Sequence, residues 1–261
     1  MIKDTIHTKA LTGTLLSRMV RFLPECPSTN DVACEFARAG EPEGLLVVTD
    51  FQTSGRGRLD RSWRAPAGSS LLFSLLLRPP LPPERALQAV MAASLGVVEG
   101  IRKECGLAAR IKWPNDILIG GRKAGGILCE LSLDGEKLDY AIIGIGLNVN
   151  FDPQKVEGIP PEATSILAKL GRSQPRTALL RAILAEMEPR YREILRGGSL
   201  REEWARALET LGRRVRVTLV NDELTGTAES VEETGALSLR LQDGTRRTIL
   251  AGDVVHLEEA K

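Results

Sequence analysis

The sequence predicts a fold of mixed α and β class, with a smaller β-rich region at the C-terminal end. Through most of the 261 residues, segments with helical periodicity alternate with short apolar segments typical of strands. After Gly212 the pattern changes to alternating polar and apolar residues, which indicates half-buried strands. This length is sufficient for a large and a small domain with a substantial core. We therefore expect a boundary near Leu211, between domains at residues 1–211 and 212–261.

The N-terminal part is expected to combine strands with two helices. Ser28 is a good N-cap residue, Asp31 follows three residues later, and helical spacing continues until Gly40. A longer helix is expected from Glu84, because apolar residues recur there on one helical face. Strands are expected at residues 15–24, 44–52 and 70–78.

The following part is expected to be strands first and helices afterwards. Pro114 cannot donate a ladder hydrogen bond, so it marks a break between two strands, and a basic turn is expected at Arg122 and Lys123. In the C-terminal region, Asp243 and Gly244 predict a hairpin turn. The expected strands are residues 109–119, 124–133, 140–150, 214–220 and 237–241, and the expected helices are residues 180–195 and 200–211.

Composition excludes several classes of function. Lys and Arg total 35 against 34 for Asp and Glu, whereas nucleic-acid-binding proteins usually carry a basic face. The four cysteines lack CxxC spacing, which favours reduced thiols in the cytoplasm. The two histidines, His7 and His256, lie near opposite ends, which argues against a histidine-based metal site or triad. We expect no signal peptide, because the N-terminus is charged and has no continuous apolar core, and no membrane segment, because the longest apolar run, from Ser70, ends at prolines.

The segment QTSGRGRLDRSW, residues 52–63, is the first candidate site. Arg56, Arg58 and Arg61 crowd positive charge into a short loop that contains two glycines. Guanidinium groups bind carboxylate or phosphate oxygens bidentately, and glycines allow a ligand to approach the backbone. The segment matches neither the GxxxxGK[ST] phosphate loop nor the GxGxxG fingerprint. We expect the loop to be mobile until it meets a small anionic ligand.

Four further segments carry polar residues at turns or at the ends of strands. STN begins a helix at Ser28, KWPND brings Asn115 and Asp116 to a turn, GRKAGGIL places Lys123 beside two glycines, and GIGLN ends at Asn148. Each segment alone is compatible with an ordinary structural role, such as a helix cap or an Asx turn. In this order, together with GRGRxxRxW, the five segments resemble the biotin protein ligase family. The resemblance extends from about Leu15 through the long helices, and only the strand pattern resembles the family's C-terminal domain.

This resemblance implies a fold, a reaction and a set of ligands. The fold would be an α+β domain with a mixed sheet, as in class II aminoacyl-tRNA synthetases, plus a small SH3-like C-terminal β-barrel. The reaction would use ATP and Mg²⁺ to convert biotin to biotinyl-5′-AMP. The biotinyl group would then pass to a lysine of a biotin carboxyl carrier protein domain.

The resemblance also assigns site residues by motif. The biotin site would comprise Ser28, Thr29, Asn30, Gln52, Arg56, Gly57, Arg58 and Lys123. The ATP site would comprise Arg58, Arg61, Trp63, Asn115, Asp116, Lys123 and Asn148. Residues that hold the metal are not identified.

Arg58, Lys123 and Asp116 are the expected catalytic residues. A carboxylate needs no general base to attack the α-phosphate, but two anions repel each other, so cations at Arg58 and Lys123 would lower the barrier. The acceptor lysine, with a reference pKa of about 10.4, must lose a proton before transfer. Asp116 could act on that amine, hold Mg²⁺ or orient Lys123, and the sequence does not distinguish these roles.

Two other functions remain open at the level of sequence. A lipoate or octanoate ligase would share the fold, although the polar set at Ser28 and Gln52 suits a ureido ring better than an aliphatic chain. A non-enzymatic ligand-sensing or nucleic-acid-binding module is the other alternative. Some family members carry an N-terminal DNA-binding domain, but 27 residues before Ser28 are too few for one, so we expect no repressor function. A homodimer through exposed strand edges is plausible.

Overall fold

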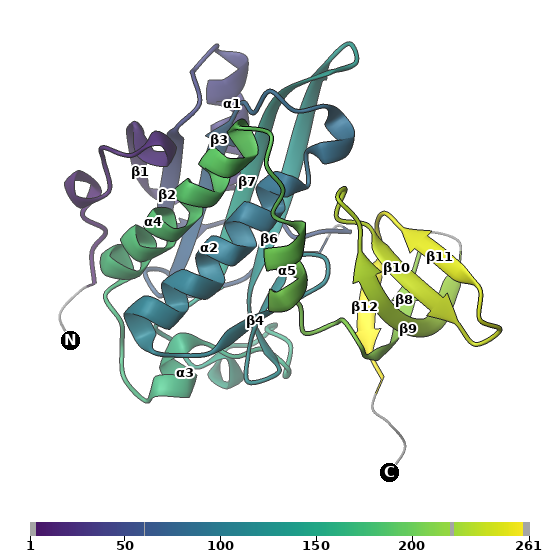
Figure 1. Cartoon of the computed structure of the whole chain (residues 1–261). Coiled ribbons are helices and arrows are strands. Elements are labelled where there is room, and N and C mark those ends of the chain that lie inside the picture. Colours follow the sequence, from purple (N-terminus) through teal and green to yellow (C-terminus); the bar gives the residue numbers. More distant parts are fainter. Residues whose placement is uncertain (1–3, 60, 220–221, 258–261) are drawn as a thin grey trace.

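The larger part of the molecule is a seven-stranded sheet covered by helices on both faces (Figure 1). The computed structural model describes residues 4–59, 61–219 and 222–257. The strand order is β1-β2-β3-β7-β6-β5-β4, and β1 and β2 are parallel whereas every other neighbouring pair is antiparallel. The strands are β1 (Met19–Cys26), β2 (Leu45–Gln52), β3 (Ser70–Leu77), β4 (Ala109–Lys112), β5 (Asp116–Ile119), β6 (Arg122–Asp134) and β7 (Lys137–Asn148).

One face of the sheet is covered by the short helix α1 (Thr29–Arg38). Successive side chains of a strand point to opposite faces, so Leu45 and Val47 pack with α1 while Leu46 and Val48 belong to the core on the other side. The N-terminal residues of α1 lie over the centre of the sheet, where Ser74 of β3 contacts them.

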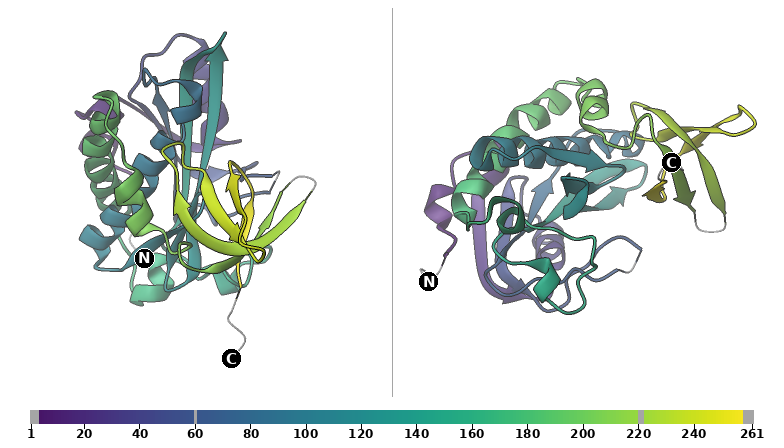
Figure 2. Two further views of the ribbon diagram at one scale, coloured as in Figure 1. Left: turned by 45° about the vertical axis from the view of Figure 1, so that its right-hand side comes forward. Right: turned by 90° about the horizontal axis from the view of Figure 1, so that it is seen from below.

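The opposite face is covered by α2 (Gln88–Cys105) and α4 (Arg176–Leu195), which lie side by side in Figures 1 and 2. Gly96 and Gly100 permit the close approach of these helices, because a Cβ at either position would lie 2.7 Å from α4 side chains. The helix α5 (Arg201–Ala207) follows and packs Trp204 against Ser94 of α2. Four 3-10 helices, Thr8–Ala10, Leu15–Ser17, Pro83–Arg85 and Pro153–Lys155, and α3 (Ile166–Leu170) occupy connections between the described elements.

The C-terminal part is a five-stranded antiparallel sheet beside the larger one (Figure 2). Its strands are β8 (Arg214–Thr218), β9 (Glu223–Val231), β10 (Leu237–Leu241), β11 (Arg246–Ile249) and β12 (Asp253–His256). Trp113 ties this sheet to the larger part, because its indole N–H donates to Gly235 O at 2.9 Å. Its backbone N–H donates to Thr210 Oγ1 at 3.0 Å. The boundary expected near Leu211 falls just before β8, and it remains a prediction.

Most expected elements are present, but α4 begins at Arg176 rather than Leu180, and α5 ends at Ala207 rather than Leu211. Four further corrections concern the ends of other elements. The first strand begins at Met19, because a 3-10 turn occupies Leu15–Ser17. The helix expected from Glu84 begins at Gln88, after prolines have favoured a separate 3-10 turn. The basic turn is displaced, because Gly120 and Gly121 take positive φ and the two basic residues that follow lie in β6.

The fourth correction concerns the start of α1. Ser28 is the N-cap residue, but its side chain makes no capping hydrogen bond, and Asp31 instead binds Arg56. The helix still ends near Gly40, as expected. Val220, at the end of one expected strand, and Asp60 of the arginine segment lie outside the described residues.

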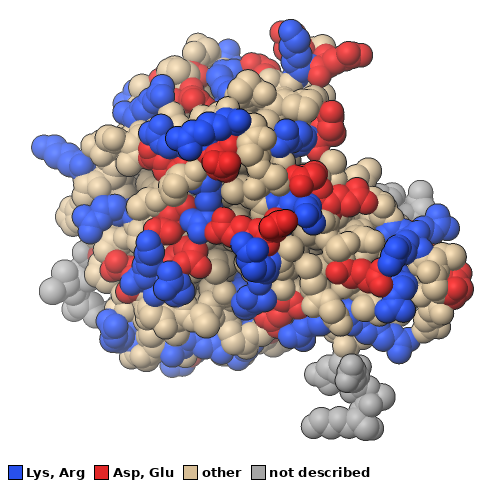
Figure 3. All heavy atoms as spheres, viewed as in Figure 1, with Lys and Arg blue, Asp and Glu red and all other residues tan. Residues whose placement is uncertain are grey.

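Charge is distributed evenly over the surface seen in Figure 3. Acidic and basic side chains are interspersed there, in keeping with a net charge of +1. Within the described residues, no helix has both the length and the apolar character required to cross a bilayer.

Candidate active site

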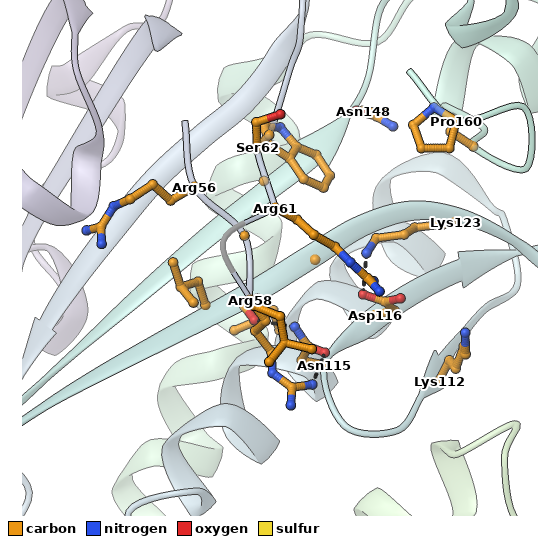
Figure 4. Close-up of a pocket in the computed structure, with 18 of the residues that line it drawn as sticks. Arg56, Arg58, Arg61, Ser62, Lys112, Asn115, Asp116, Lys123, Asn148 and Pro160 are labelled. Atoms are coloured by element: carbon orange, nitrogen blue, oxygen red, sulfur yellow. Dashed lines mark hydrogen bonds and ion pairs between the residues drawn. The ribbon is translucent and has the colours of Figure 1, made fainter. Parts of the chain in front are cut away.

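All thirteen site residues predicted from the sequence line one cavity of about 660 Å³. The cavity lies over the central strands, between the arginine segment, the start of α1 and β12 of the C-terminal sheet. Its volume is in the range of cavities that bind a small molecule together with a nucleotide-sized group. Figure 4 shows that Arg58 and Asn115 meet at one side, whereas Arg61, Lys123 and Asp116 gather at another.

One end of the cavity is formed by uncharged polar groups that hydrogen-bond to one another. Thr29 binds Gln52 twice, because its N–H (2.8 Å) and its hydroxyl (3.1 Å) both donate to Gln52 Oε1. This double contact leaves Nε2 of Gln52 as the donor available to a ligand. The Ser74 hydroxyl lies 2.7 Å from Thr29 Oγ1 and 2.6 Å from Asn30 Oδ1, and its single proton can be donated to one of these oxygens at a time. Ser74 was missed in the sequence because it lies inside an otherwise apolar strand.

Arg56 is held by two acidic residues rather than left free for a ligand. Its guanidinium lies 2.5 Å from Asp31 Oδ1 and 2.9 Å from Glu130 Oε1. Burial lowers the pKa of Arg56 most strongly, but the Glu130 and Asp31 carboxylates together raise it above its ordinary value. In Figure 4 its side chain points away from Lys123 and Asp116. The charge crowding inferred from the sequence is thus relieved at Arg56 by residues on α1 and β6.

The arginine segment folds back on itself. Arg56 and Ser62 form an antiparallel bridge, Gly57 N–H donates to Arg61 O at 2.6 Å, and Trp63 N–H donates to Gly55 O at 2.8 Å. Gly55 is required by this close approach, because a Cβ there would lie 2.5 Å from Trp63 O. Internal hydrogen bonds and ion pairs connect the described part of the segment to itself and to its neighbours. That the segment becomes ordered only when an anionic ligand binds remains a prediction.

The C-terminal sheet contacts the other two arginines. Arg58 donates to Asn115 Oδ1 at 3.1 Å and to Gly252 O at 3.2 Å, and Arg61 donates to Asp253 Oδ2 at 2.5 Å. Burial lowers the pKa of Arg58, but its guanidinium stays charged at neutral pH because the reference value is so high. Hydrogen bonding to Asp253 raises the pKa of Arg61. Asp253 was not predicted, because its strand shows no motif in the sequence.

Lys123 and Asp116 form an ion pair inside the cavity. Nζ of Lys123 lies 2.5 Å from Asp116 Oδ1, with exposed side-chain fractions of 36% and 19%. Asp116 begins β5, and Lys123 of β6 pairs with Leu118, two residues further along β5, so the antiparallel ladder brings Lys123 close to Asp116. The neighbouring Asn115 is fixed by its Nδ2 donating to Ile127 O at 2.7 Å.

Trp63 forms an apolar wall over two glycines of the sheet. A Cβ at Gly146 would lie 2.6 Å from Trp63 Cε2, and one at Gly126 would lie 3.6 Å from Trp63 Cζ3. Two buried polar atoms of this region, Trp63 Nε1 and Asn148 Oδ1, lack a hydrogen-bond partner among the described residues. An unpaired buried polar atom costs free energy, so both atoms are candidates for ligand contacts.

Several cavity residues were not predicted from the sequence. Residues 158–160 and 162–163 contribute to the wall, and Lys123 fixes part of this connection because its O accepts from Thr164 N–H at 2.7 Å. His256 lies 3.1 Å from Thr210 Oγ1, and burial lowers its pKa to about 4. Lys112, Arg64 and Glu162 add charged side chains to the lining.

Known proteins resemble this chain over almost its whole length. Residues 23–148 match the Biotin/lipoate A/B protein ligase family, and residues 210–257 match the biotin protein ligase C-terminal domain. The bifunctional ligase/repressor BirA of Bacillus spizizenii is 36% identical over 87% of this chain and 70% of its own length. The biotin–[acetyl-CoA-carboxylase] ligase of Mycobacterium tuberculosis is 32% identical over 92% of this chain and 90% of its own. The chain belongs to the biotin protein ligase family.

A solved structure extends this similarity to three dimensions. The biotin protein ligase from Aquifex aeolicus, in complex with biotin and ATP, matches this ligase with a TM-score of 0.75. The two are 27% identical, and the match covers 92% of this chain and 99% of the other. The expected α+β fold with a separate C-terminal β-sheet is therefore confirmed.

Proposed function

We propose that this ligase activates biotin with ATP as biotinyl-5′-AMP and transfers the biotinyl group to a lysine of a biotin carboxyl carrier protein domain. The observation that carries the proposal is the cavity itself. One end holds uncharged hydrogen-bonding groups at Thr29 and Gln52, and the other holds cations at Arg58 and Lys123. A neutral ring with a carboxylate tail, joined to a nucleotide phosphate, matches this division of polarity.

In the first step, the protein would act mainly through electrostatics. Biotin carboxylate and the α-phosphate are both anions, so their approach is opposed by repulsion. A unit positive charge about 4 Å away stabilises an anion by about 4 kcal/mol at an effective dielectric near 20. Arg58 and Lys123 supply two such charges, and half-burial in the cavity keeps water from screening them fully. The stacking wall for the adenine would be Trp63, with Asn148 Oδ1 accepting a hydrogen bond from the base.

In the second step, the role best supported for Asp116 is to orient Lys123. The 2.5 Å ion pair occupies one carboxylate oxygen, which makes Asp116 a weaker candidate for removing the acceptor's proton. The carrier lysine would instead reach the adenylate already deprotonated, or lose its proton to solvent at the cavity mouth. Closure of the arginine segment over the adenylate would protect the anhydride from hydrolysis.

Mg²⁺ would be held mainly by the nucleotide. Among the described residues, no group of three or more His, Cys, Asp or Glu side chains is arranged to bind a metal ion. Mg²⁺ commonly binds substrate phosphates with only one or two protein carboxylates. Of the cavity carboxylates Asp116, Glu162 and Asp253, Asp116 lies beside Lys123 and would be the one to serve as such a ligand, and the ion would neutralise phosphate charge when bound.

We further propose a cytoplasmic enzyme that acts on protein rather than nucleic acid. Balanced surface charge supports the absence of a nucleic-acid partner.

A homodimer remains a proposal. The part of β6 after Ile127 has no paired strand on the side away from β7 within the described sheet, and such an edge can pair with another strand. Lipoate or octanoate is a less suitable substrate, because neither offers partners to Thr29 and Gln52.

Pyrophosphate release tests this proposal directly. The chain is supplied with ATP and Mg²⁺ together with biotin, lipoate, octanoate or an amino acid in turn. We expect release with biotin at least about a hundredfold faster than with the other acids. An acid that lacks the hydrogen-bonding groups of biotin would leave buried polar groups of the site unpaired, which raises the free energy of its complex. Lys123→Met is the matched control and should abolish release without unfolding the chain. Release with lipoate in preference to biotin would refute the proposal.

A further inference from the structure

Glu130, on β6, lies at the junction of three elements that surround the polar end of the cavity. Its Oε2 accepts from Asn30 Nδ2 at 2.6 Å, and its carboxylate also pairs with Arg56 at 2.9 Å and 3.1 Å. It thereby joins β6 to the start of α1 and to the arginine segment. None of the five motifs in the sequence contains it.

The two sides of the Asn30 amide face opposite kinds of partner. A carboxylate can only accept hydrogen bonds at neutral pH, so the Asn30 atom next to Glu130 must be the NH₂ group. On the other side, Ser74 donates to Asn30 Oδ1 at 2.6 Å. Turning the amide over would place its oxygen against the Glu130 carboxylate, so that two acceptors would face each other. The Ser74 hydroxyl can accept as well as donate, so Glu130 is the partner that decides the orientation.

The fixed amide determines what a ligand meets at this point. One hydrogen of Nδ2 binds Glu130, and the second is left to donate into the cavity that Asn30 lines. Gln52 presents Nε2 for the same reason, since its oxygen is occupied by Thr29. The polar end thus offers two amide donors, which suit a ligand carbonyl oxygen.

Asn30 also has little freedom to move. Its side chain lies directly over Gly144 of β7, where any Cβ would collide with the amide oxygen. The residue is only 3% exposed. The sheet below, Ser74 at one side and Glu130 at the other therefore define a single position for the amide.

We propose that Glu130 is a positioning residue that sets the orientation of the Asn30 amide, and through it the affinity of the ligase for the ureido carbonyl of biotin. This inference rests on the proposed function, because it takes biotin as the ligand. It differs from a purely electrostatic role of Glu130 toward Arg56. Asp31 shares that electrostatic role, since it also pairs with Arg56, whereas the Asn30 amide is bound by Glu130.

The test compares KM for biotin and for ATP in pyrophosphate release by the full chain. Glu130→Ala should raise KM for biotin about tenfold and leave KM for ATP within about twofold, as expected for loss of one hydrogen bond to a charged group. Glu130→Gln keeps an acceptor for Asn30 and should stay within about threefold of the wild type, whereas a role in charge alone predicts equal damage in both variants. Asp31→Asn is the matched control, with biotin KM within about twofold.

A double-mutant cycle completes the test. If Glu130 acts through Asn30, Glu130→Ala should have no further effect on biotin KM in an Asn30→Ala background. Equal rises in both KM values, or additive effects of Glu130→Ala and Asn30→Ala, would overturn the inference. If Glu130→Ala fails to fold, a biotin KM for Glu130→Gln as high as that for Asn30→Ala overturns it instead. Failure of the wild type to release pyrophosphate with biotin would count against the proposed function and is seen before any variant is compared.

Discussion

Asp116 Oδ1 lies 2.5 Å from Lys123 Nζ. This ion pair fixes the lysine side chain in the cavity in which the biotin carboxylate and the α-phosphate are proposed to bind. A lysine has four rotatable bonds, so holding its ammonium in one place costs side-chain entropy. Because the ion pair already restricts the side chain, little further entropy is lost when the substrates bind. We therefore expect Asp116 to contribute most to adenylate formation and little to acyl transfer.

Asp116→Asn should separate these two steps. We expect the rate of adenylate formation to fall at least about tenfold, which corresponds to about 1.4 kcal/mol of lost stabilisation. The rate of transfer from pre-formed biotinyl-5′-AMP to the carrier should stay within about twofold of the wild-type rate, because the positioning of Lys123 is needed for adenylate formation, which has then already occurred. Single-turnover assays of each step give the two rates. A transfer rate reduced as strongly as adenylation would show that Asp116 serves as a base.

At the scale of residues, the sequence was informative wherever a motif was present. The motifs identified thirteen cavity residues, because each lies in a short segment whose glycines and polar side chains are typical of ligand contacts. Ser74, Glu130 and Asp253 were not predicted, since each stands alone in an ordinary strand. Their partners lie 44, 74 and 192 positions away along the chain, and only the fold brings them together.

At the scale of elements, the arginine segment is attached at both sides. Arg56 binds α1 and β6, whereas Arg58 and Arg61 bind the start of β12. The small C-terminal sheet therefore supports the end of the cavity that contains Arg58 and Arg61. The strand period predicted β8 and β10, and the turn at Asp243 predicted the hairpin to β11, but β9 and β12 were not predicted. Only the folded molecule reveals that β12 lines the cavity.

Arg58→Gly should loosen the hold on the adenylate. The substitution removes a half-buried cation together with its contacts to Asn115 and Gly252. We expect biotinyl-5′-AMP to dissociate at least about tenfold faster, since a hydrogen bond to a charged group contributes about 1.5–3 kcal/mol. Trapping of released adenylate on an amine in solution measures this rate. A dissociation rate equal to that of the wild type would contradict the clamping role.

The attachment of β12 should also depend on pH through His256. Burial lowers its pKa from 6.5 to about 4, so the unfolded chain binds the proton more readily than the folded one. The stability from the neutral ring is therefore present above about pH 6.5 and is lost as pH falls toward about 4. At pH 5 the loss should be about 2 kcal/mol.

Urea unfolding at pH 7 and pH 5 measures this dependence. His256→Gln keeps a polar side chain beside Thr210 but cannot titrate, so its change in unfolding free energy between the two pH values should be about 2 kcal/mol smaller than that of the wild type. If both proteins lose the same stability, His256 is not the responsible group.

At the scale of the whole molecule, Arg176 connects the N-terminal segment to the sheet. Its guanidinium is fully buried and lies 2.9 Å from Asp4 and 2.8 Å from Asp50, and it donates to Ser70 O at 3.0 Å. Asp50 stands two residues before Gln52 on β2, so this cluster also supports the floor of the cavity. The cluster was not predicted from the sequence, because Arg176 precedes the helix expected at residues 180–195 and no motif distinguishes it from an exposed arginine.

Asp50→Asn should therefore lower the stability of the entire fold. Removing one of two carboxylates from a buried guanidinium is expected to cost about 2–3 kcal/mol of unfolding free energy. Glu202→Gln, which breaks an exposed pair with Arg201 at 3.6 Å, is the control and should cost less than about 0.5 kcal/mol. Equal effects of the two substitutions in urea unfolding would contradict the role assigned to Arg176.

Arg58 and Lys123 are expected to flank the phosphorus at which two anions are joined, and the proposed chemistry depends on this placement. A crystal structure of this ligase with biotinyl-5′-AMP tests it most directly. We expect the Arg58 guanidinium and Lys123 Nζ within hydrogen-bonding distance of the phosphate or acyl oxygens, and the biotin ring beside Thr29 and Gln52. A complex in which both cations point away from the phosphate would contradict it.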